Sequence, residues 1–395
     1  MLEYIAYAKT CAIQAGRYFM KDDRTQMTVN LDTRRVESEW ATEIYISAAP
    51  AKSAPLQQQL CEIFSRIADI IRSEKAHILQ ERIFATQGVM EIVRQIRSNQ
   101  YGDIDDGVPP SLLVGREGLF GPISGAQVHA VNAGGAPEVV SLDGKACGRI
   151  LHLKDRTYLT LSGISALQFQ NAKEQARAIL EKSESALKQF AANIFSVART
   201  WMWLGDILSW YDDFNRVRNE FFAQRGAIGK GSTQAMPAST GIGLTPANGG
   251  KCAMDLIAVL APAGAIEYLQ AVGRQQSAFE YGSAFSRACR AITPAAETVF
   301  ISGTASIDAG GNTVHIGDIP GQINATIENV RAVLRDMRCR DEQVVQVVAY
   351  CKNTEVEKIF NDLKGRLHWP WVTAICDICR PELLFEIEAV GMPDR

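Results

Sequence analysis

Three short apolar segments recur along the chain, and each ends in a corner of small residues. They are predicted strands at 43–49, 157–163 and 298–303. If Ser47, Ser162 and Ser302 are equivalent, the offsets are 162 − 47 = 115 and 302 − 162 = 140 residues. Spacings of that size are those of whole domains. The pattern therefore predicts three versions of one structural unit.

The segments after each corner follow the same order in all three units. Apolar residues three and four positions apart predict helices at 60–70, 176–190 and 327–337. Runs rich in β-branched or aromatic residues follow at 77–86, 194–203 and 344–351. A second helix is clearest at 214–224 and 356–367. Two strands close each unit, at 111–114 with 126–131, 236–243 with 253–259 and 372–378 with 383–390. The predicted order is β-β-α-β-α-β-β in each unit.

This order predicts an α/β (α+β) fold of tandem units. Each unit is expected to be a mixed β-sheet with two helices on one face. The other sheet faces are also apolar, so the three units can pack sheet to sheet around a common axis as an internal pseudo-trimer that needs no self-association. Turn residues at Gly134-Gly135 and at 261–264 predict units at 1–134, 135–262 and 263–395. Chance similarity of short β-α-β segments is the alternative interpretation.

Composition narrows the classes of function. The chain has 395 residues, 47% hydrophobic and 22% charged, as in a globular protein of several domains. Its net charge of −3 argues against a nucleic-acid partner, so local arginines must hold any anionic substrate. The absence of a long apolar run or a leader pattern argues against a membrane partner, and nine scattered cysteines favour a cytoplasmic location.

Few patterns in the sequence indicate a metal or a cofactor. Cys376 and Cys379 have the Cys-x-x-Cys spacing, but no second pair stands near them. The five histidines show no metal-binding spacing, and no Gly-rich phosphate loop is present. We therefore expect catalysis without a cofactor or a metal.

The last predicted strand carries the candidate acid. Residues alternate there, with Leu384, Glu386 and Glu388 on one face of the strand. One interpretation is a strand face exposed to water, where glutamates are ordinary. The other is that one glutamate lines a cleft, where partial burial raises its pKa and makes it a proton donor.

The third unit resembles the reactive-intermediate imine/enamine deaminase (YjgF-like) superfamily, whose sites lie between subunits. Those deaminases carry a substrate-holding arginine fifteen residues before the first closing glutamate, and Trp371 stands at that position here. The resemblance rests on Phe300–Ser306, His315 with Gly317 and Asp318, Gln322, Thr326, Asn329 and Phe385–Ala389.

From about Arg149 to Met392 the chain resembles the chorismatases, which hydrolyse or eliminate the enolpyruvyl ether of chorismate. The stretch 218–225 departs from that family's Tyr-Arg-x-Phe-x-x-Gly-Arg pattern, and residues 1–134 match its leader poorly. The matching motifs, in the family's order, are Ala198–Trp201, Met236–Gly243, Tyr281-Gly282, Phe285–Ala288, Val314–Asp318 and Asp377–Glu388.

The resemblance implies roles for seven residues. Glu386 matches the family's general acid, and Cys379 matches a position where cysteine marks enzymes that form 3-hydroxybenzoate. Ala288 stands where that subgroup has glycine, so the product stays open between a dihydrodiol and a hydroxybenzoate. The expected binding residues for a small dianionic substrate are Arg199, Arg225, Arg287, Arg380 and Tyr281.

The leading hypothesis is thus a chorismatase-like enzyme that releases pyruvate from chorismate or a related compound. A hydrolase or deaminase for another enol ether, enamine or imine is a second hypothesis, favoured by the altered 218–225 stretch. A non-catalytic small-molecule-binding protein of the same fold is a third. Turnover of chorismate, turnover of 2-aminoacrylate, and ligand binding without turnover separate the three.

Overall fold

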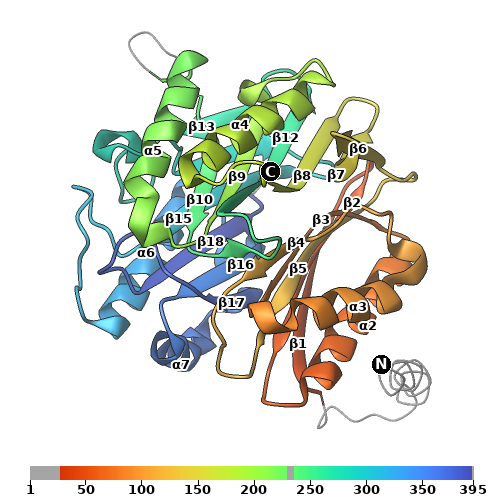
Figure 1. Cartoon of the computed structure of the whole chain (residues 1–395), viewed down its shortest axis with the longest axis horizontal. Helices are drawn as coiled ribbons and strands as arrows, with labels where there is room; N and C mark the ends of the chain where they lie inside the picture. Colours follow the sequence, from red (N-terminus) through yellow and green to blue (C-terminus); the bar gives the residue numbers. More distant parts are fainter. Residues whose placement is uncertain (1–26, 229–234, 394–395) are drawn as a thin grey trace.

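Three six-stranded mixed sheets make up the protein, with helices on the outside (Figure 1). The structure is a computed structural model that describes residues 27–228 and 235–393. The first sheet has the order β1-β2-β5-β3-β4-β11, and helices α2 (Leu56–Ser73) and α3 (Met90–Tyr101) cover it. Its strands are β1 (Val29–Glu37), β2 (Thr42–Pro50), β3 (His77–Ala85), β4 (Ser111–Val114), β5 (Ile123–Asn132) and β11 (Thr245–Pro246).

The second and third sheets repeat this plan. The second sheet has the order β10-β9-β12-β8-β7-β6, and its helices are α4 (Ala172–Lys188) and α5 (Ile207–Gln224). Its strands are β6 (Glu138–Leu142), β7 (Lys145–His152), β8 (Thr157–Ile164), β9 (Val197–Leu204), β10 (Ala238–Ile242) and β12 (Cys252–Ala261). The third sheet has the order β13-β14-β15-β18-β16-β17, and its helices are α6 (Ile319–Asp336) and α7 (Thr354–Leu363). Its strands are β13 (Ile266–Leu269), β14 (Ala288–Ile292), β15 (Glu297–Ala305), β16 (Val344–Cys351), β17 (Trp371–Ile375) and β18 (Phe385–Gly391).

The predicted fold class of tandem mixed sheets with helices is confirmed. The order β-β-α-β-α-β-β holds in the first unit, and a leading strand precedes it in the other two, namely β6 and β13. The first sheet instead gains β11, which pairs antiparallel with β4. Ser47, Ser162 and Ser302 lie on β2, β8 and β15, strands that hold corresponding places in the three sheets. The boundaries at 134 and 262 stay predictions.

The apolar residues form four cores, which explains why both faces of each sheet are apolar in sequence. One core lies between each sheet and its helices. The fourth lies where the bare faces of the three sheets meet, and all three units contribute to it, with Phe84, Trp201 and Tyr350 among its largest side chains. Burial of this shared apolar surface holds the units together as a pseudo-trimer in one chain.

The last strand is shorter than the pattern predicted. β18 begins at Phe385, and Cys376 and Cys379 lie in the loop before it rather than on a strand. Both cysteines are free thiols. Within the described ranges, no helix is long and apolar enough to cross a membrane.

Candidate active site

The two faces of β18 meet different surroundings. Phe385, Ile387 and Ala389 pack into the core beneath the helices of the third unit. Glu386 and Glu388 point the other way, toward the second unit, and each residue is only 4% exposed. The closing strand therefore has no water-exposed face, and the glutamates need an explanation from their partners.

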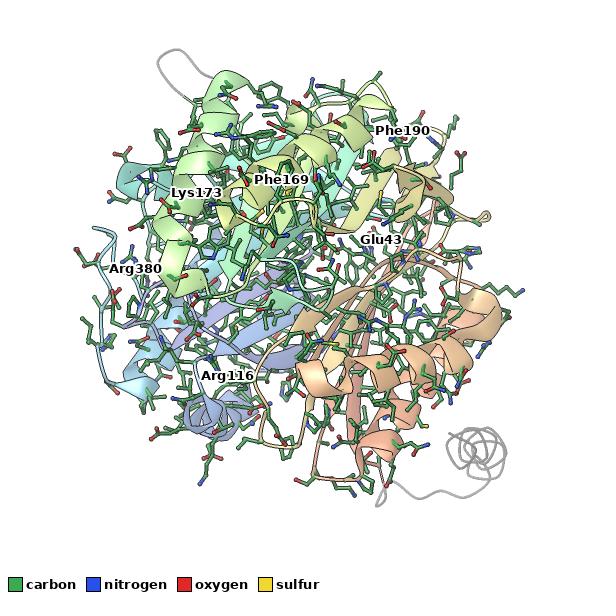
Figure 2. All side chains as sticks on the ribbon, in the orientation of Figure 1. Glu43, Arg116, Phe169, Lys173, Phe190 and Arg380 are labelled. Carbon is green, nitrogen blue, oxygen red and sulfur yellow. The ribbon has the colours of Figure 1, made fainter. Side chains whose placement is uncertain are left out.

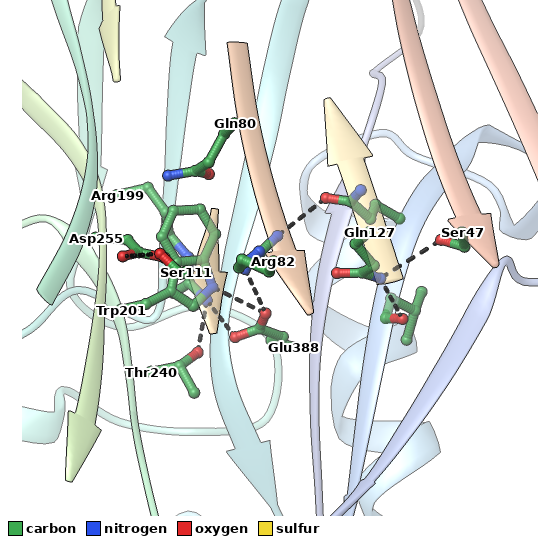
Figure 3. Close-up of polar contacts among 12 residues, drawn as sticks. Ser47, Gln80, Arg82, Ser111, Gln127, Arg199, Trp201, Thr240, Asp255 and Glu388 are labelled. Carbon is green, nitrogen blue, oxygen red and sulfur yellow. Dashed lines mark hydrogen bonds and ion pairs between the residues drawn. The ribbon is translucent and has the colours of Figure 1, made fainter. Parts of the chain in front are cut away.

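Glu388 is a fully paired carboxylate at the junction of the three units (Figure 3). It accepts hydrogen bonds from Arg199 Nη2 at 2.8 Å, Trp201 Nε1 at 2.8 Å and Arg82 Nη1 at 3.1 Å. Arg82 comes from the first unit and also donates to Gln346 Oε1 at 3.1 Å. Two buried guanidinium groups thus surround one buried carboxyl group and satisfy its oxygens with hydrogen bonds.

Glu386 lies two residues away and has the opposite character. No hydrogen bond to its carboxyl group is found among the described residues. The group packs directly on Gly303, where an added Cβ atom would lie 2.1 Å from Glu386 Oε1 and 3.3 Å from the methyl group of Thr240. Burial, together with the negative charge of Glu388, raises the pKa of Glu386 to about 8, although Arg199 and Arg287 act to lower it. At neutral pH this side chain is a carboxylic acid with a proton to donate.

Cys379 is close enough for the charge of Glu386 to act on it. Its side chain is partly buried, and burial followed by the nearby Glu386 charge raises the pKa of the thiol to about 12. The residue is therefore a neutral thiol at neutral pH and has little thiolate character. In this position it can shape the site or donate a weak hydrogen bond.

The arginines predicted to hold substrate fall in different places. Arg287 is 3% exposed, its Nε donates to the carbonyl of Gln276 at 3.0 Å, and its charge acts on Glu386. Arg199 is also buried and donates to Thr240 Oγ1 at 2.5 Å besides its pair with Glu388. These two guanidinium groups therefore lie beside the candidate acid.

Arg225 and Arg380 are engaged elsewhere. Arg225 follows α5 and donates two hydrogen bonds, at 2.6 and 2.8 Å, to Glu184 on α4, so its charge is neutralised in the helix layer. Arg380 donates to the carbonyl of Gly311 at 2.9 Å and to Thr313 Oγ1 at 3.3 Å, and lies toward the edge of the molecule in Figure 2. Tyr281 ends a short 3-10 helix, Ala278–Tyr281, and its side chain lies outside the described part of the structure.

Sequence reasoning missed Arg82 and Gly303 as parts of this site. Arg82 lies in a strand whose other residues are mostly buried. Because a buried charge is rare without a partner, a charged residue in such a strand was the signal that could have indicated a polar contact there. Gly303 was predicted as the corner of a repeat and as part of the Phe300–Ser306 motif, without a role beside Glu386. Among the described residues, no group of three or more His, Cys, Asp or Glu side chains is placed to hold a metal ion.

Comparisons with known proteins agree with this architecture. Residues 276–392 match the family model described as endoribonuclease L-PSP. A solved chorismatase structure aligns over 93% of this chain and 100% of its own, with 18% identity and a TM-score of 0.60. A putative endoribonuclease from Thermotoga maritima aligns over 33% of this chain and 98% of its own, with 18% identity and a TM-score of 0.27. No curated protein matches the chain. The chain thus has the fold of a chorismatase, as predicted, and its C-terminal unit matches the L-PSP family.

Proposed function

We propose that the protein cleaves the enolpyruvyl ether of chorismate, or of a closely related compound, by general acid catalysis from Glu386. The observation that carries this proposal is a buried carboxyl group that has no hydrogen-bond partner among the described residues and whose pKa is raised to about 8, beside a paired carboxylate and two guanidinium groups. An enol ether is activated by protonation at carbon, which requires an acid that still holds its proton at the working pH. The chorismatase fold supports the choice of substrate class.

The reaction would begin with transfer of the Glu386 proton to the terminal methylene carbon of the enolpyruvyl group. The C=C electron pair forms the new C–H bond, and the ether carbon becomes an oxocarbenium ion. Addition of water to that carbon and loss of a proton give a hemiketal, which collapses to pyruvate and a ring alcohol. In the other route the intermediate rearranges on the ring and yields pyruvate and a hydroxybenzoate. Cys379 lies beside the acid, where it would influence the choice between the routes.

The neighbours of Glu386 have opposite effects that suit a proton donor. Burial and Glu388 keep the resting acid protonated, whereas Arg199 and Arg287 stabilise the carboxylate that forms when the proton leaves. The pair between Glu388 and Arg199 holds that guanidinium group in a fixed position. Because Glu386 is 4% exposed, substrate must displace covering side chains to reach it.

Pyruvate release tests the proposal. The full-length protein is incubated with chorismate, and pyruvate is followed with lactate dehydrogenase and NADH. Glu386→Gln should lower kcat by 10²–10⁴, the usual contribution of a general acid. Glu297→Gln on the exposed start of β15 is the matched control and should keep full activity. Folded protein that releases no pyruvate, or a Glu386→Gln variant with unchanged kcat, would overturn the proposal.

A second candidate is cleavage of another enol ether, enamine or imine by the same acid. It is favoured by the pairing of Arg225 with Glu184 and of Arg199 with Glu388, which uses two of the four guanidinium groups expected to hold a dianion. Ammonia release from 2-aminoacrylate without action on chorismate would establish it. Thermal stabilisation by chorismate without turnover of either compound would instead indicate a binding protein.

A further inference from the structure

Arg218 is a buried arginine on the inner face of α5, in the stretch that departs from the chorismatase pattern. It is 1% exposed and is one of the largest fully buried side chains in the described part of the protein. Its Nη2 donates to Asn215 Oδ1 at 2.7 Å, and its guanidinium carbon lies 5.1 Å from the centre of the Phe214 ring. Asn219, which stands where the pattern has arginine, instead donates to the carbonyl of Gly282 at 2.9 Å. In this chain the guanidinium group is thus displaced by one helix position, which turns it about 100° around α5.

The ring of Phe285 is in contact with both Arg218 and an arginine of the Glu386 site. The guanidinium carbons of Arg218 and Arg287 lie 5.4 and 5.6 Å from the centre of this one ring. The two carbons are therefore at most 11.0 Å apart, the sum of those distances, and the charge of Arg287 in turn acts on Glu386. Contact with an aromatic face is favourable for each cation, so two of them can lie in one buried region.

The same face of α5 also approaches the acid through β10. A Cβ atom added to Gly241 would lie 3.4 Å from the ring of Tyr211, and the preceding residue, Thr240, has its methyl group close to the Glu386 carboxyl group. Tyr211 and Arg218 are seven positions apart, which is two turns along one face of a helix, or roughly 10 Å along its axis. A substrate that extends from Glu386 along this face would reach Arg218.

A chorismate-like substrate needs two anion-binding groups at different distances from the acid. Its enolpyruvyl carboxylate is bonded to the ether carbon, next to the methylene carbon that accepts the proton, so it lies close to Glu386 and to the neighbouring Arg199 and Arg287. Its other carboxylate is carried by the ring, beyond the ether oxygen. Arg225, which the sequence motif favours for this task, is paired with Glu184 in the helix layer. A different guanidinium group is therefore needed for the ring carboxylate.

We propose that Arg218 holds the ring carboxylate of the substrate and thereby selects dicarboxylic enol ethers over monocarboxylic ones. The inference rests on the function proposed for Glu386, because the acid fixes where the enolpyruvyl end lies. Arg218 and Glu386 are 1% and 4% exposed, so the displacement of covering side chains that admits substrate has to reach both. In this arrangement the Phe285 ring offers an apolar surface to the flat ring of the substrate.

Two ligands that differ only in the ring carboxylate test this role. They are 3-(1-carboxyvinyloxy)benzoate and 2-phenoxyacrylate, and each is titrated calorimetrically into the full-length Glu386→Gln protein, which cannot protonate them. The dicarboxylate should bind roughly 10- to 100-fold more tightly, the range expected for one interaction with a charged group. Arg218→Met should abolish this difference by weakening only the dicarboxylate, and Arg218→Lys should retain part of it. Arg216→Met, at a 72% exposed arginine of the same helix, is the matched control and should retain the full difference.

Equal affinity of the two ligands for the Glu386→Gln protein would overturn the proposal, and so would a difference that persists in Arg218→Met. An equal loss of affinity for both ligands would make Arg218 a structural residue and would overturn it as well. If Arg218→Met does not fold, Arg218→Gln decides by the same affinity ratio.

Pyruvate release from chorismate by the protein with Glu386 intact is measured separately. Release without any effect of Arg218→Met on the affinity ratio would refute the role of Arg218 alone. An affinity ratio that depends on Arg218, without release of pyruvate, would refute the activity proposed for Glu386 alone. The two proposals therefore fail in distinguishable ways.

Discussion

Replacing Glu386 with glutamine should change the pH dependence of stability in a defined direction. Glutamine has the shape of the protonated acid and cannot ionise, so it retains the neutral state that burial imposes on Glu386. In the wild type, the folded protein keeps this proton up to about pH 8, whereas the unfolded chain loses it above about 4.5. The folded state therefore binds more protons in that window, and its stability falls as pH rises through it.

The size of this effect follows from the two pKa values. The interval from 4.5 to about 8, at 1.36 kcal/mol per pH unit, corresponds to about 5 kcal/mol at full ionisation. The loss is absent below pH 4.5, grows between 4.5 and 8, and is constant above 8. Residues common to both proteins cancel in the comparison. Glu386→Gln should thus gain up to about 5 kcal/mol relative to wild type between these limits.

Urea unfolding at pH 5, 6, 7, 8 and 9 measures this difference. The midpoints of wild type and variant should lie close together at pH 5 and separate progressively up to pH 8. Infrared difference spectra of the folded proteins give a direct check, since the wild type should show a carboxylic-acid C=O band that disappears with a midpoint near pH 8. Glu297→Gln, at an exposed carboxylate, should follow the wild type at every pH.

A stability difference that stays constant from pH 5 to 9 would refute the reasoning. So would a variant that becomes less stable than the wild type as pH rises. Either result would mean that Glu386 is ionised in the folded protein and that a neighbouring group compensates its charge. The proton-donor role would then lose its physical basis.

Three further predictions follow from the same site. If Glu386 is the acid, kcat/KM for pyruvate release should be level below pH 8 and fall about tenfold per pH unit above it, as the folded acid loses its proton. Arg82→Met leaves Glu388 with one guanidinium partner, so it should lower the free energy of unfolding, measured in urea, by about 3–5 kcal/mol. Loss of the half-exposed ion pair between Arg116 and Asp377 should lower it by less than about 1 kcal/mol. Gly303→Ala places a methyl group against the Glu386 carboxyl group. It should lower the free energy of unfolding by about 1–3 kcal/mol and also lower kcat. In the Glu386→Ala background the loss of stability should be smaller, because the carboxyl group that the methyl group meets is gone.

The fold was predictable because its signals are local and repeated. Helical spacing at 60–70, 176–190 and 327–337 corresponds to α2, α4 and α6, and the β-branched run at 344–351 is β16 itself. Three weak patterns in the same order support each other more than one pattern would. The added strands β13 and β11 could not be predicted in this way, because each is an edge strand that pairs with a segment distant in the sequence. β6 differs, because it forms a hairpin with β7 through the Asp143-Gly144 turn, a local signal that the strand pattern alone did not use.

The site was predictable only in part, for a physical reason. Alternation along the closing strand places Glu386 and Glu388 on one face, but it carries no information about which of them meets arginines. That difference arises from Arg82, about 300 positions earlier, and from Arg199, which another unit supplies. Arg225 also stands at a motif position, in a stretch that departs from the motif, and its partner Glu184 lies on the neighbouring helix. Contacts between units depend on the packed arrangement and leave no periodic trace in the sequence.

The threefold repeat places a polar side chain at the same position of each unit. Gln127, Asp255 and Glu388 lie on β5, β12 and β18, strands that hold the same place in their sheets, and each ties one unit to another. Gln127 donates to the carbonyl of Val347, Asp255 accepts from Ser111 at 2.7 Å, and Glu388 accepts from arginines of both other units. In all three units, the polar side chain at this position thus forms a hydrogen bond to another unit. Two residues earlier the units differ, with glycine, alanine and Glu386 in turn. Among these three corresponding positions, only the one in the third unit carries a carboxyl group, and Glu386 there is buried beside Arg199 and Arg287.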